Sequence, residues 1–244
     1  MNNIKAYSLP AELLRGLVFD ESTHKYSIDG VSSDIVSVTT FIAKFFAPFD
    51  AESIAVNLCE SHPSYIGTPP EALMAQWAAE TQAGTDAHKE LEDYIMSGTK
   101  PTKPKAIAGV NWLNNQNWDD KELYTEVRIF SEELGIAGTV DLLVKDLKSE
   151  SYSIYDWKTN KKIDFSGYNG KRGILPPTAR LDDCKYIVYG LQMSLYRLIL
   201  ESEYGLKVTG QTLLHLGNIC NPIKTSYLKD ELLGMIEYYK EKKV

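Results

Sequence analysis

The chain has 244 residues, of which 43% are hydrophobic and 24% are charged. This composition is ordinary for a globular protein, so it excludes collagen-like, low-complexity and disordered classes. No apolar run approaches the roughly 18 residues that a membrane-spanning helix needs. The opening segment, MNNIKAYSLPAELLRG, has the pattern of neither a signal peptide nor a transit peptide. We therefore expect a cytoplasmic protein without a membrane partner.

The charge is unevenly distributed along the chain. The formal net charge is −7, but residues 158–244 carry fourteen Lys and Arg against nine Asp and Glu, whereas residues 1–157 carry twelve against twenty-four. Six basic residues and one acid, Asp164, lie within 158–180; the basic ones are Lys158, Lys161, Lys162, Lys171, Arg172 and Arg180. A basic stripe in an acidic protein is either a nucleic-acid footprint or, more commonly, a solvated face.

The three cysteines are scattered and have no CxxC spacing. Cys59, Cys184 and Cys220 are therefore expected to be buried or semi-buried free thiols. This spacing does not favour a disulfide framework, a zinc ribbon or a four-thiolate iron–sulfur cluster.

The first half of the chain combines short β runs with longer helical patterns. The expected elements are β runs broken by turns from residue 17 to about 42, a helical stretch from Ser37–Thr40 to about Glu60, a loop over 61–70, a helix over 71–97, a connector over 98–105 and a short helix to about Trp118. Pro69 and Pro70 favour the start of the long helix.

The second half begins with three strand patterns that short connections join. The expected strands are 122–132, 135–146 and 151–160, which are followed by an irregular segment over 161–182, a helix over 183–204, a strand over 208–217 and a helix over 227–243. Asp182 or Asp183 can cap the helix that follows the irregular segment. Because short connections favour antiparallel neighbours, we predict an α+β sandwich with a mixed central sheet that is antiparallel at its centre and flanked by helices.

Asp156 and Lys158 lie two residues apart on a predicted strand. Their side chains should leave the same face of the sheet, with Trp157 on the other. Five D/E-x-K triplets occur, which is near chance for this composition; they begin at Asp119, Asp146, Asp156, Asp183 and Glu241. Only the triplet at Asp156 lies at the end of a predicted strand that comes after another predicted strand with a lone acid.

That lone acid is Asp141, in the apolar strand AGTVDLLV. Strict alternation would put Val140, Leu142 and Val144 on one face and Thr139, Asp141 and Leu143 on the other. A buried acid needs a partner or a cation, and Gly138 allows a bulge or the close approach of another group. If the strands are adjacent, Asp141 and Asp156 converge beside Lys158. Two carboxylates suit Mg²⁺ or Mn²⁺, but a structural Asp141–Lys158 ion pair would explain the same residues.

Two helices supply the other polar candidates. His88 lies one turn after Gly84, so it can project past the missing side chain toward a neighbouring sheet; the alternative is a surface or hydrogen-bonded histidine, which is how we interpret His24, His62 and His215. Gln192 and Tyr196 lie one turn apart, opposite an expected core stripe formed by Ile187, Leu191, Leu195 and Leu198.

Four motifs in order resemble the RecB-like exonuclease branch of the PD-(D/E)xK nuclease superfamily, of phage or bacterial type. The branch pattern is GxxxH, GxxD, (D/E)xK and QxxxY; this chain has Gly84-Thr-Asp-Ala-His88, Gly138-Thr-Val-Asp141, Asp156-Trp-Lys158 and Gln192-Met-Ser-Leu-Tyr196. The resemblance covers about 84–217. It implies a restriction-endonuclease-like core over about 71–244 and, before it, a β-hairpin and helix appendage over about 1–70, together a single nuclease domain.

The resemblance also implies roles by position. His88, Asp141, Asp156 and the Trp157 carbonyl would bind one or two Mg²⁺ or Mn²⁺ ions, without an iron–sulfur cluster. Lys158 would orient or activate the attacking water, Gln192 and Tyr196 would contact the substrate, and Glu126 would support the ligands or act as an alternative acid. From the basic segment and its glycines, we expect 158–180 to arch over the site and bind single strands, with Tyr168 stacking on a base.

The implied function is a metal-dependent deoxyribonuclease, foremost an exonuclease acting on DNA ends or single strands in recombination, repair or replication, with 5′-phosphate and 3′-hydroxyl products. Two alternatives stay open: a structure-specific endonuclease or nickase, and a catalytically inactive nuclease-fold protein that binds DNA. An enzyme of small molecules or an interaction domain with accidental motifs is a weaker alternative. The resemblance further implies a helicase or recombinase as a protein partner.

Overall fold

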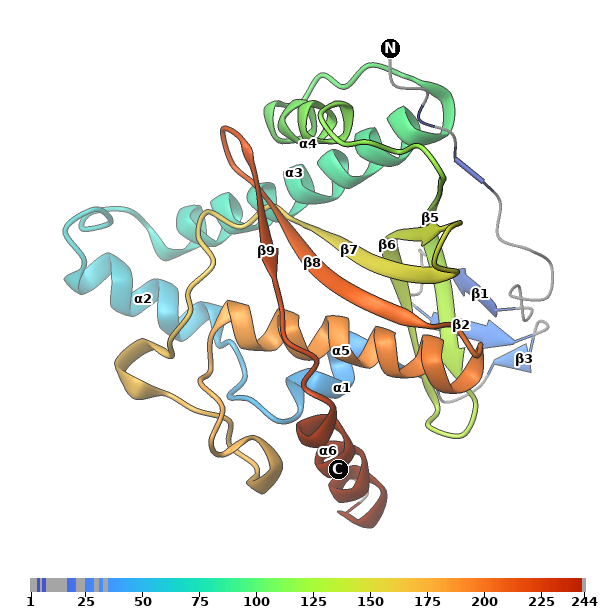
Figure 1. Cartoon of the computed structure of the whole chain (residues 1–244). Coiled ribbons are helices and arrows are strands. Elements are labelled where there is room, and N and C mark those ends of the chain that lie inside the picture. The colour runs from blue at the N-terminus through green and yellow to red at the C-terminus, as the bar shows by residue number, and fades with distance from the viewer. Residues whose placement is uncertain are drawn as a thin grey trace.

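A computed structural model describes residues 4, 6–7, 17–20, 25–28, 31–32 and 35–242. A six-stranded mixed sheet forms its centre, and helices cover both faces (Figure 1). The strands of this sheet are β4 (Val36–Ser37), β5 (Lys121–Ser131), β6 (Ile136–Asp146), β7 (Ser151–Lys158), β8 (Val208–Leu216) and β9 (Cys220–Lys224). A separate three-stranded antiparallel sheet contains β1 (Leu17–Asp20), β2 (Lys25–Ile28) and β3 (Val31–Ser32).

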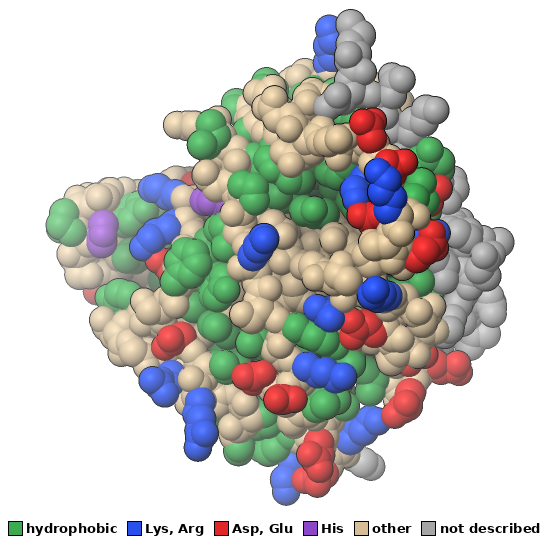
Figure 2. Space-filling view, in the orientation of Figure 1, with side chains coloured by type: hydrophobic (Ala, Val, Ile, Leu, Met, Phe, Trp, Pro, Cys, Tyr) green, Lys and Arg blue, Asp and Glu red, His purple; other side chains and the backbone are tan. Residues whose placement is uncertain are grey.

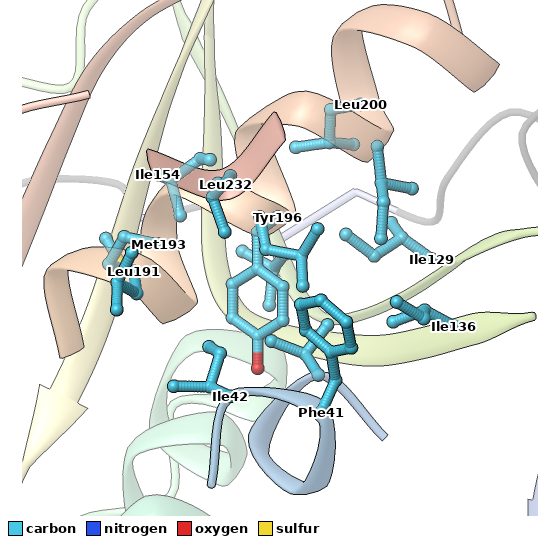
Figure 3. Packing of buried hydrophobic residues seen from close by; sticks show 14 of the residues in the cluster. Phe41, Ile42, Ile129, Ile136, Ile154, Leu191, Met193, Tyr196, Leu200 and Leu232 are labelled. Carbon is cyan, nitrogen blue, oxygen red and sulfur yellow. The ribbon is translucent and has the colours of Figure 1, made fainter. Parts of the chain in front are cut away.

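The helices form two layers. They are α1 (Val38–Ala43), α2 (Ala51–Ser61), α3 (Pro70–Ser97), α4 (Pro104–Asn114), α5 (Lys185–Glu203) and α6 (Lys229–Lys242), with 3₁₀ turns η2 (Tyr168–Gly170) and η3 (Pro176–Thr178). Helices α1, α5 and α6 bury their apolar side chains in one core cluster, and α3 and α4 do so in a second cluster on the other face of the sheet. Figure 3 shows the first cluster, where Tyr196 of α5 lies close to Phe41 and Ile42 of α1.

Strand β6 pairs with three other strands of the sheet. Strand β5 pairs with it antiparallel along its full length. On its other side, β7 pairs antiparallel with residues 142–146, and β4 pairs parallel with residues 136–137. Strand β8 then joins β7 in parallel, and β9 forms the antiparallel edge. The expectation of a mixed sheet with flanking helices is confirmed, and β5, β6 and β7 are antiparallel neighbours as expected, whereas β7 and β8 pair in parallel.

This pairing leaves a gap in the sheet. Between the partners of β4 and those of β7, residues 138–141 of β6 have no neighbouring strand on that side among the described residues. The gap contains both Gly138 and Asp141. A Cβ atom on Gly138 would lie 2.5 Å from Cε1 of Tyr196, so the absent side chain admits the tyrosine ring at this point.

The helical stretch expected over about 37–60 is two helices. Helix α1 ends at Ala43, and α2 begins after Asp50, whose side chain accepts a hydrogen bond from the Ser53 amide at 3.0 Å. Pro48 explains the interruption, because proline disfavours helical backbone in the residue before it. Ser37 caps α1 in the same way, through the Thr40 amide.

The boundary expected near residue 70 does not separate an appendage from the core. Val38, Phe41, Ile42 and Phe45 are at most 1% exposed and belong to the largest core cluster. Strand β4 is part of the central sheet. The turns at 21–24 and 29–30, with His24, lie outside the described residues.

Other departures are local. Helix α5 begins after Cys184, which makes no side-chain cap, so the expected cap by Asp182 or Asp183 is wrong. Strand β4 lies within the β runs expected from residue 17 to about 42, whereas β9 was not predicted. All three cysteines are free thiols: Cys59 and Cys184 are buried, and Cys220 is partly buried, as expected.

Within the part of the chain that the structure describes, no helix has the length and apolar character to cross a membrane.

Candidate active site

Three acidic residues stand level with one another across the sheet. The registers on either side, Thr125↔Leu142 and Val127↔Val140, put Glu126 of β5 opposite Asp141 of β6. The pairing Leu142↔Tyr155 likewise puts Asp156 of β7 level with Asp141 on its other side. The predicted convergence of Asp141 and Asp156 therefore follows from the observed register.

The sheet is kinked at this level. Glu126 has φ +50°, a backbone conformation that non-glycine residues rarely adopt in a strand. On β6, Val140 lies in the α5-side cluster, whereas Leu142 and Val144 lie in the α3-side cluster. The expectation that Val140, Leu142 and Val144 share one face is thus wrong, because the strand alternation reverses at Asp141.

Asp141 lies at the point where β6 and β7 separate. Its Oδ2 accepts a hydrogen bond from the Trp157 amide at 2.8 Å, which satisfies an amide that the diverging strands leave without a ladder partner. The same oxygen is 3.5 Å from Nδ1 of His88 on α3. Gly84, one turn earlier, faces Thr159: a Cβ atom there would lie 2.6 Å from the threonine Oγ1, so α3 can approach β7 closely.

Asp156 is buried beneath Lys158. Its side chain is 2% exposed, and its Oδ2 lies 2.5 Å from the lysine Nζ. That oxygen accepts no hydrogen bond of satisfactory geometry from the described residues, so the contact is an ion pair rather than a directed hydrogen bond. The nearest carboxylate of Lys158 is therefore Asp156, not Asp141 as the structural ion-pair alternative supposed.

Gln192 of α5 connects these groups. Its Nε2 donates to Asp156 Oδ1 at 3.2 Å and to the Tyr196 hydroxyl at 2.9 Å, and its Oε1 accepts from Lys158 Nζ at 3.1 Å. Gln192 and Tyr196 are both buried. In this structure Gln192 holds Asp156 and Lys158 in place, Tyr196 supports Gln192, and neither of the two lines the cleft.

Sequence reasoning missed two supports of Lys158. The lysine Nζ lies 4.2 Å from the centroid of the Tyr189 ring, a cation–π contact. The Tyr189 hydroxyl donates to Asn160 Oδ1 at 2.5 Å, and the Asn160 carbonyl is 2.8 Å from His215 Nε2. Tyr189 lies one turn before Gln192 on the same helical face, and this spacing was the available signal.

A cleft of about 950 Å³ opens over this group. Its walls include seven of the predicted positions: Gly84, His88, Glu126, Asp141, Trp157, Lys158 and Lys161. Phe49, Trp77, Lys105, Lys185 and Tyr189 also line it. Asp156, Gln192 and Tyr196 lie behind the wall rather than on it.

Burial and mutual repulsion favour the neutral forms of Asp141 and Glu126 at the cleft. Burial, with the nearby Asp156, raises the pKa of Asp141 to about 6. Burial and the charges of Asp141, Glu92 and Asp156 raise the pKa of Glu126 to about 8. Burial alone would lower the pKa of Lys158, but Asp156 and Asp141 outweigh that effect and raise it.

Carboxylate and imidazole side chains at the cleft are potential ligands of a divalent cation. Among the described residues, no three His, Cys, Asp or Glu side chains converge closely enough to hold a metal ion as they stand. The chemistry of the set nevertheless fits one, because oxygen ligands suit Mg²⁺ and Mn²⁺. Asp156 Oδ2 accepts no directed hydrogen bond, and the raised pKa values of Asp141 and Glu126 mark an acidic cluster that a cation would stabilise.

The basic segment does not arch over the cleft as expected. After Lys161 it turns away and is held against the end of α1, where the Phe45 carbonyl accepts from the Ile174 amide at 2.9 Å and from Thr178 Oγ1 at 3.0 Å. Lys162 pairs with Asp164 at 2.5 Å. Tyr168 and Lys171 line a neighbouring cavity, whereas Arg172 and Arg180 are exposed and line neither space.

The comparisons with known proteins identify no relative, so the geometry of the cleft is the guide to function. No protein-family model matches the chain, and no curated protein is found to match it.

Proposed function

We propose that this protein is a metal-dependent deoxyribonuclease with a restriction-endonuclease-like core, which hydrolyses phosphodiester bonds at DNA ends or in single strands. One observation carries the proposal: Asp141, Asp156, Lys158 and His88, which come from three elements, gather where the sheet opens between β6 and β7 at the base of a cleft. A module that only binds DNA has no physical need for buried carboxylates beside a buried lysine.

Each residue has a role that its surroundings suit. Asp141, His88 and Asp156, with Glu126 and the Trp157 carbonyl beside them, would hold a divalent cation. When bound, such an ion lowers the pKa of an attacking water and offsets the negative charge of the phosphate. Lys158, which Asp156 and Asp141 keep protonated at neutral pH, would stabilise the charge that develops on the phosphate oxygens. Gln192 and Tyr189 fix the position of that lysine.

The reaction is hydrolysis. Water adds to phosphorus, the bond from phosphorus to the 3′ oxygen breaks, and the products carry a 5′-phosphate and a 3′-hydroxyl. Incubation with end-labelled linear single strands, linear duplexes and closed circles, with Mg²⁺ or Mn²⁺ or with a chelator, tests it. Degradation of linear DNA alone indicates an exonuclease and cutting of circles an endonuclease or nickase. The absence of cleavage with every substrate and metal would contradict the proposal.

Variants separate chemistry from binding. We expect Lys158→Ala to lose at least about 100-fold in turnover, because electrostatic groups at a reacting centre typically contribute that much, while DNA affinity changes little. Lys148→Ala is the matched control: Lys148 ends another D-x-K triplet, is 79% exposed and pairs with Asp120 away from the cleft. Equal activities of the two variants would remove Lys158 from the mechanism.

A further inference from the structure

A second cavity adjoins the cleft. It has a volume of about 750 Å³ and lies between the 44–50 connection, the basic segment and the start of α5. The two spaces share Phe49 and Lys185 in their walls. A chain that occupies the cleft can therefore continue into the cavity past these two side chains.

The walls of this cavity combine exposed aromatic rings with two lysines and two acids, Asp164 and Asp183. Phe49 is 70% exposed and Tyr168 is 76% exposed, although folding normally buries rings of this size. Phe49 is also 5.7 Å from the Trp77 ring of the cleft, measured between ring centroids. Lys171 and Lys185 border the same space, and Phe46 and Val188 form part of its apolar lining. Figure 2 shows hydrophobic, basic and acidic side chains intermingled on the side of the molecule near α2.

We infer that this cavity is a subsite for unpaired nucleotides of a single strand whose adjacent phosphate lies in the cleft; this inference rests on the proposed function. Phe49 and Tyr168 stack on bases, and Lys171 and Lys185 contact the phosphates between them. The combination of ring faces and ammonium groups is what proteins use to bind single strands without sequence preference. A duplex does not suit it, because paired and stacked bases offer no free faces to the two rings.

The test measures binding without cleavage. Fluorescence anisotropy with a labelled twelve-residue oligothymidylate in chelator compares the natural protein with a Phe49→Ala/Tyr168→Ala variant. Stacking of one base on an aromatic ring is worth about five- to 150-fold in affinity, so we expect at least a fivefold loss. Phe165→Ala is the matched control, since Phe165 is 61% exposed on the same segment, stacks on Tyr186 and lines neither space; its affinity should stay within twofold.

Two further probes identify what the rings recognise. An oligomer of the same length with abasic sugars should bind the natural protein and the double variant alike, and so should a blunt duplex. Lys171→Ala should weaken oligothymidylate binding and reduce its salt dependence, whereas Lys148→Ala should not. The inference would be overturned if the double variant and the natural protein bound oligothymidylate with equal affinity. It would also be overturned if the double variant lost as much affinity for the abasic oligomer as for oligothymidylate.

The outcome is separable from that of the proposed function. If the natural protein cleaves no DNA but the double variant loses affinity for oligothymidylate, the subsite is supported and the nuclease function is rejected. Cleavage of DNA with unchanged binding in the double variant would sustain the nuclease and reject the subsite.

Discussion

At the scale of single residues, the decisive feature is a lysine held among carboxylates. Lys158 is 12% exposed, and Asp156 and Asp141 outweigh the cost of its burial and keep it charged. Asp156 in turn depends on that ammonium, because Gln192 is its only other polar partner among the described side chains. The two groups are therefore mutually necessary in the folded protein.

Removing the ammonium alone should destabilise the fold. In Lys158→Met, Asp156 remains buried without a cation, which typically costs about 3–5 kcal/mol. The double variant Asp156→Asn/Lys158→Met removes both charges and should regain most of the loss. Urea unfolding at pH 7.5 in chelator measures both. Single and double variants of equal stability would show that the pair does not interact.

Glu126 should destabilise the folded protein as it ionises. Its pKa is raised to about 8 from an ordinary value of 4.5, so folding favours its protonated form and stability falls as the pH rises from about 4.5 to 8. Glu126→Gln should thus be more stable than the natural protein at pH 8 by at least about 1 kcal/mol and no more stable at pH 4. The control is Glu132→Gln, at an exposed position just after β5; a benefit at pH 4 equal to that at pH 8 would disprove the electrostatic cause.

At the scale of elements, the gap in the sheet depends on the contact between β6 and α5. The Tyr196 ring occupies the space above Gly138, and its hydroxyl accepts from Gln192, which holds Lys158. A substitution of Gly138 should therefore alter the position of Lys158 through α5.

Gly138→Ala should destabilise the protein by about 1–3 kcal/mol through overpacking. The added Cβ would lie 2.5 Å from Tyr196 Cε1 and 3.1 Å from Val38 Cγ2, so the ring must move. Gly217→Ala is the control, since its nearest atom would lie at an ordinary 3.7 Å. Thermal unfolding of both variants gives the comparison, and equal midpoints would show that the ring adjusts without cost.

At the scale of the whole molecule, metal binding and folding should be linked. A ligand at 100 times its dissociation constant stabilises the folded state by about 2.7 kcal/mol. For a chain of this size, that corresponds to a rise of roughly 5–10 °C in the unfolding midpoint.

We expect Mn²⁺ to produce such a rise at pH 7.5, and Asp141→Asn to abolish it. The rise should shrink at pH 5, because Asp141, with its pKa raised to about 6, is then largely protonated. Asp119→Asn, at an exposed aspartate of another D-x-K triplet, should respond like the natural protein. Differential scanning fluorimetry measures all three, and an unchanged midpoint in the natural protein at saturating Mn²⁺ would count against the metal site.

The sequence alone predicted the long elements, because their patterns are local. The three strands ending near 131, 146 and 158, the helix containing His88 and the helix containing Gln192 each span enough residues for a period to be read. Short connections between the strands then imply antiparallel order, and this order already aligns Asp141 with Asp156. The residues that gather at the cleft were predictable to that extent.

Only the tertiary structure decided how those residues face one another. Two-residue β4 has no period, yet its pairing with β6 closes one side of the gap. The contacts of Lys158 with Gln192 and Tyr189, and the cavity that Phe49 shares with the basic segment, also bring together residues distant in sequence. A local sequence pattern indicates on which face of a helix or strand a side chain lies. The residues that it contacts depend on how twisted strands and packed helices meet. That is why the candidate site residues could be predicted from the sequence, but the arrangement of their charges could not.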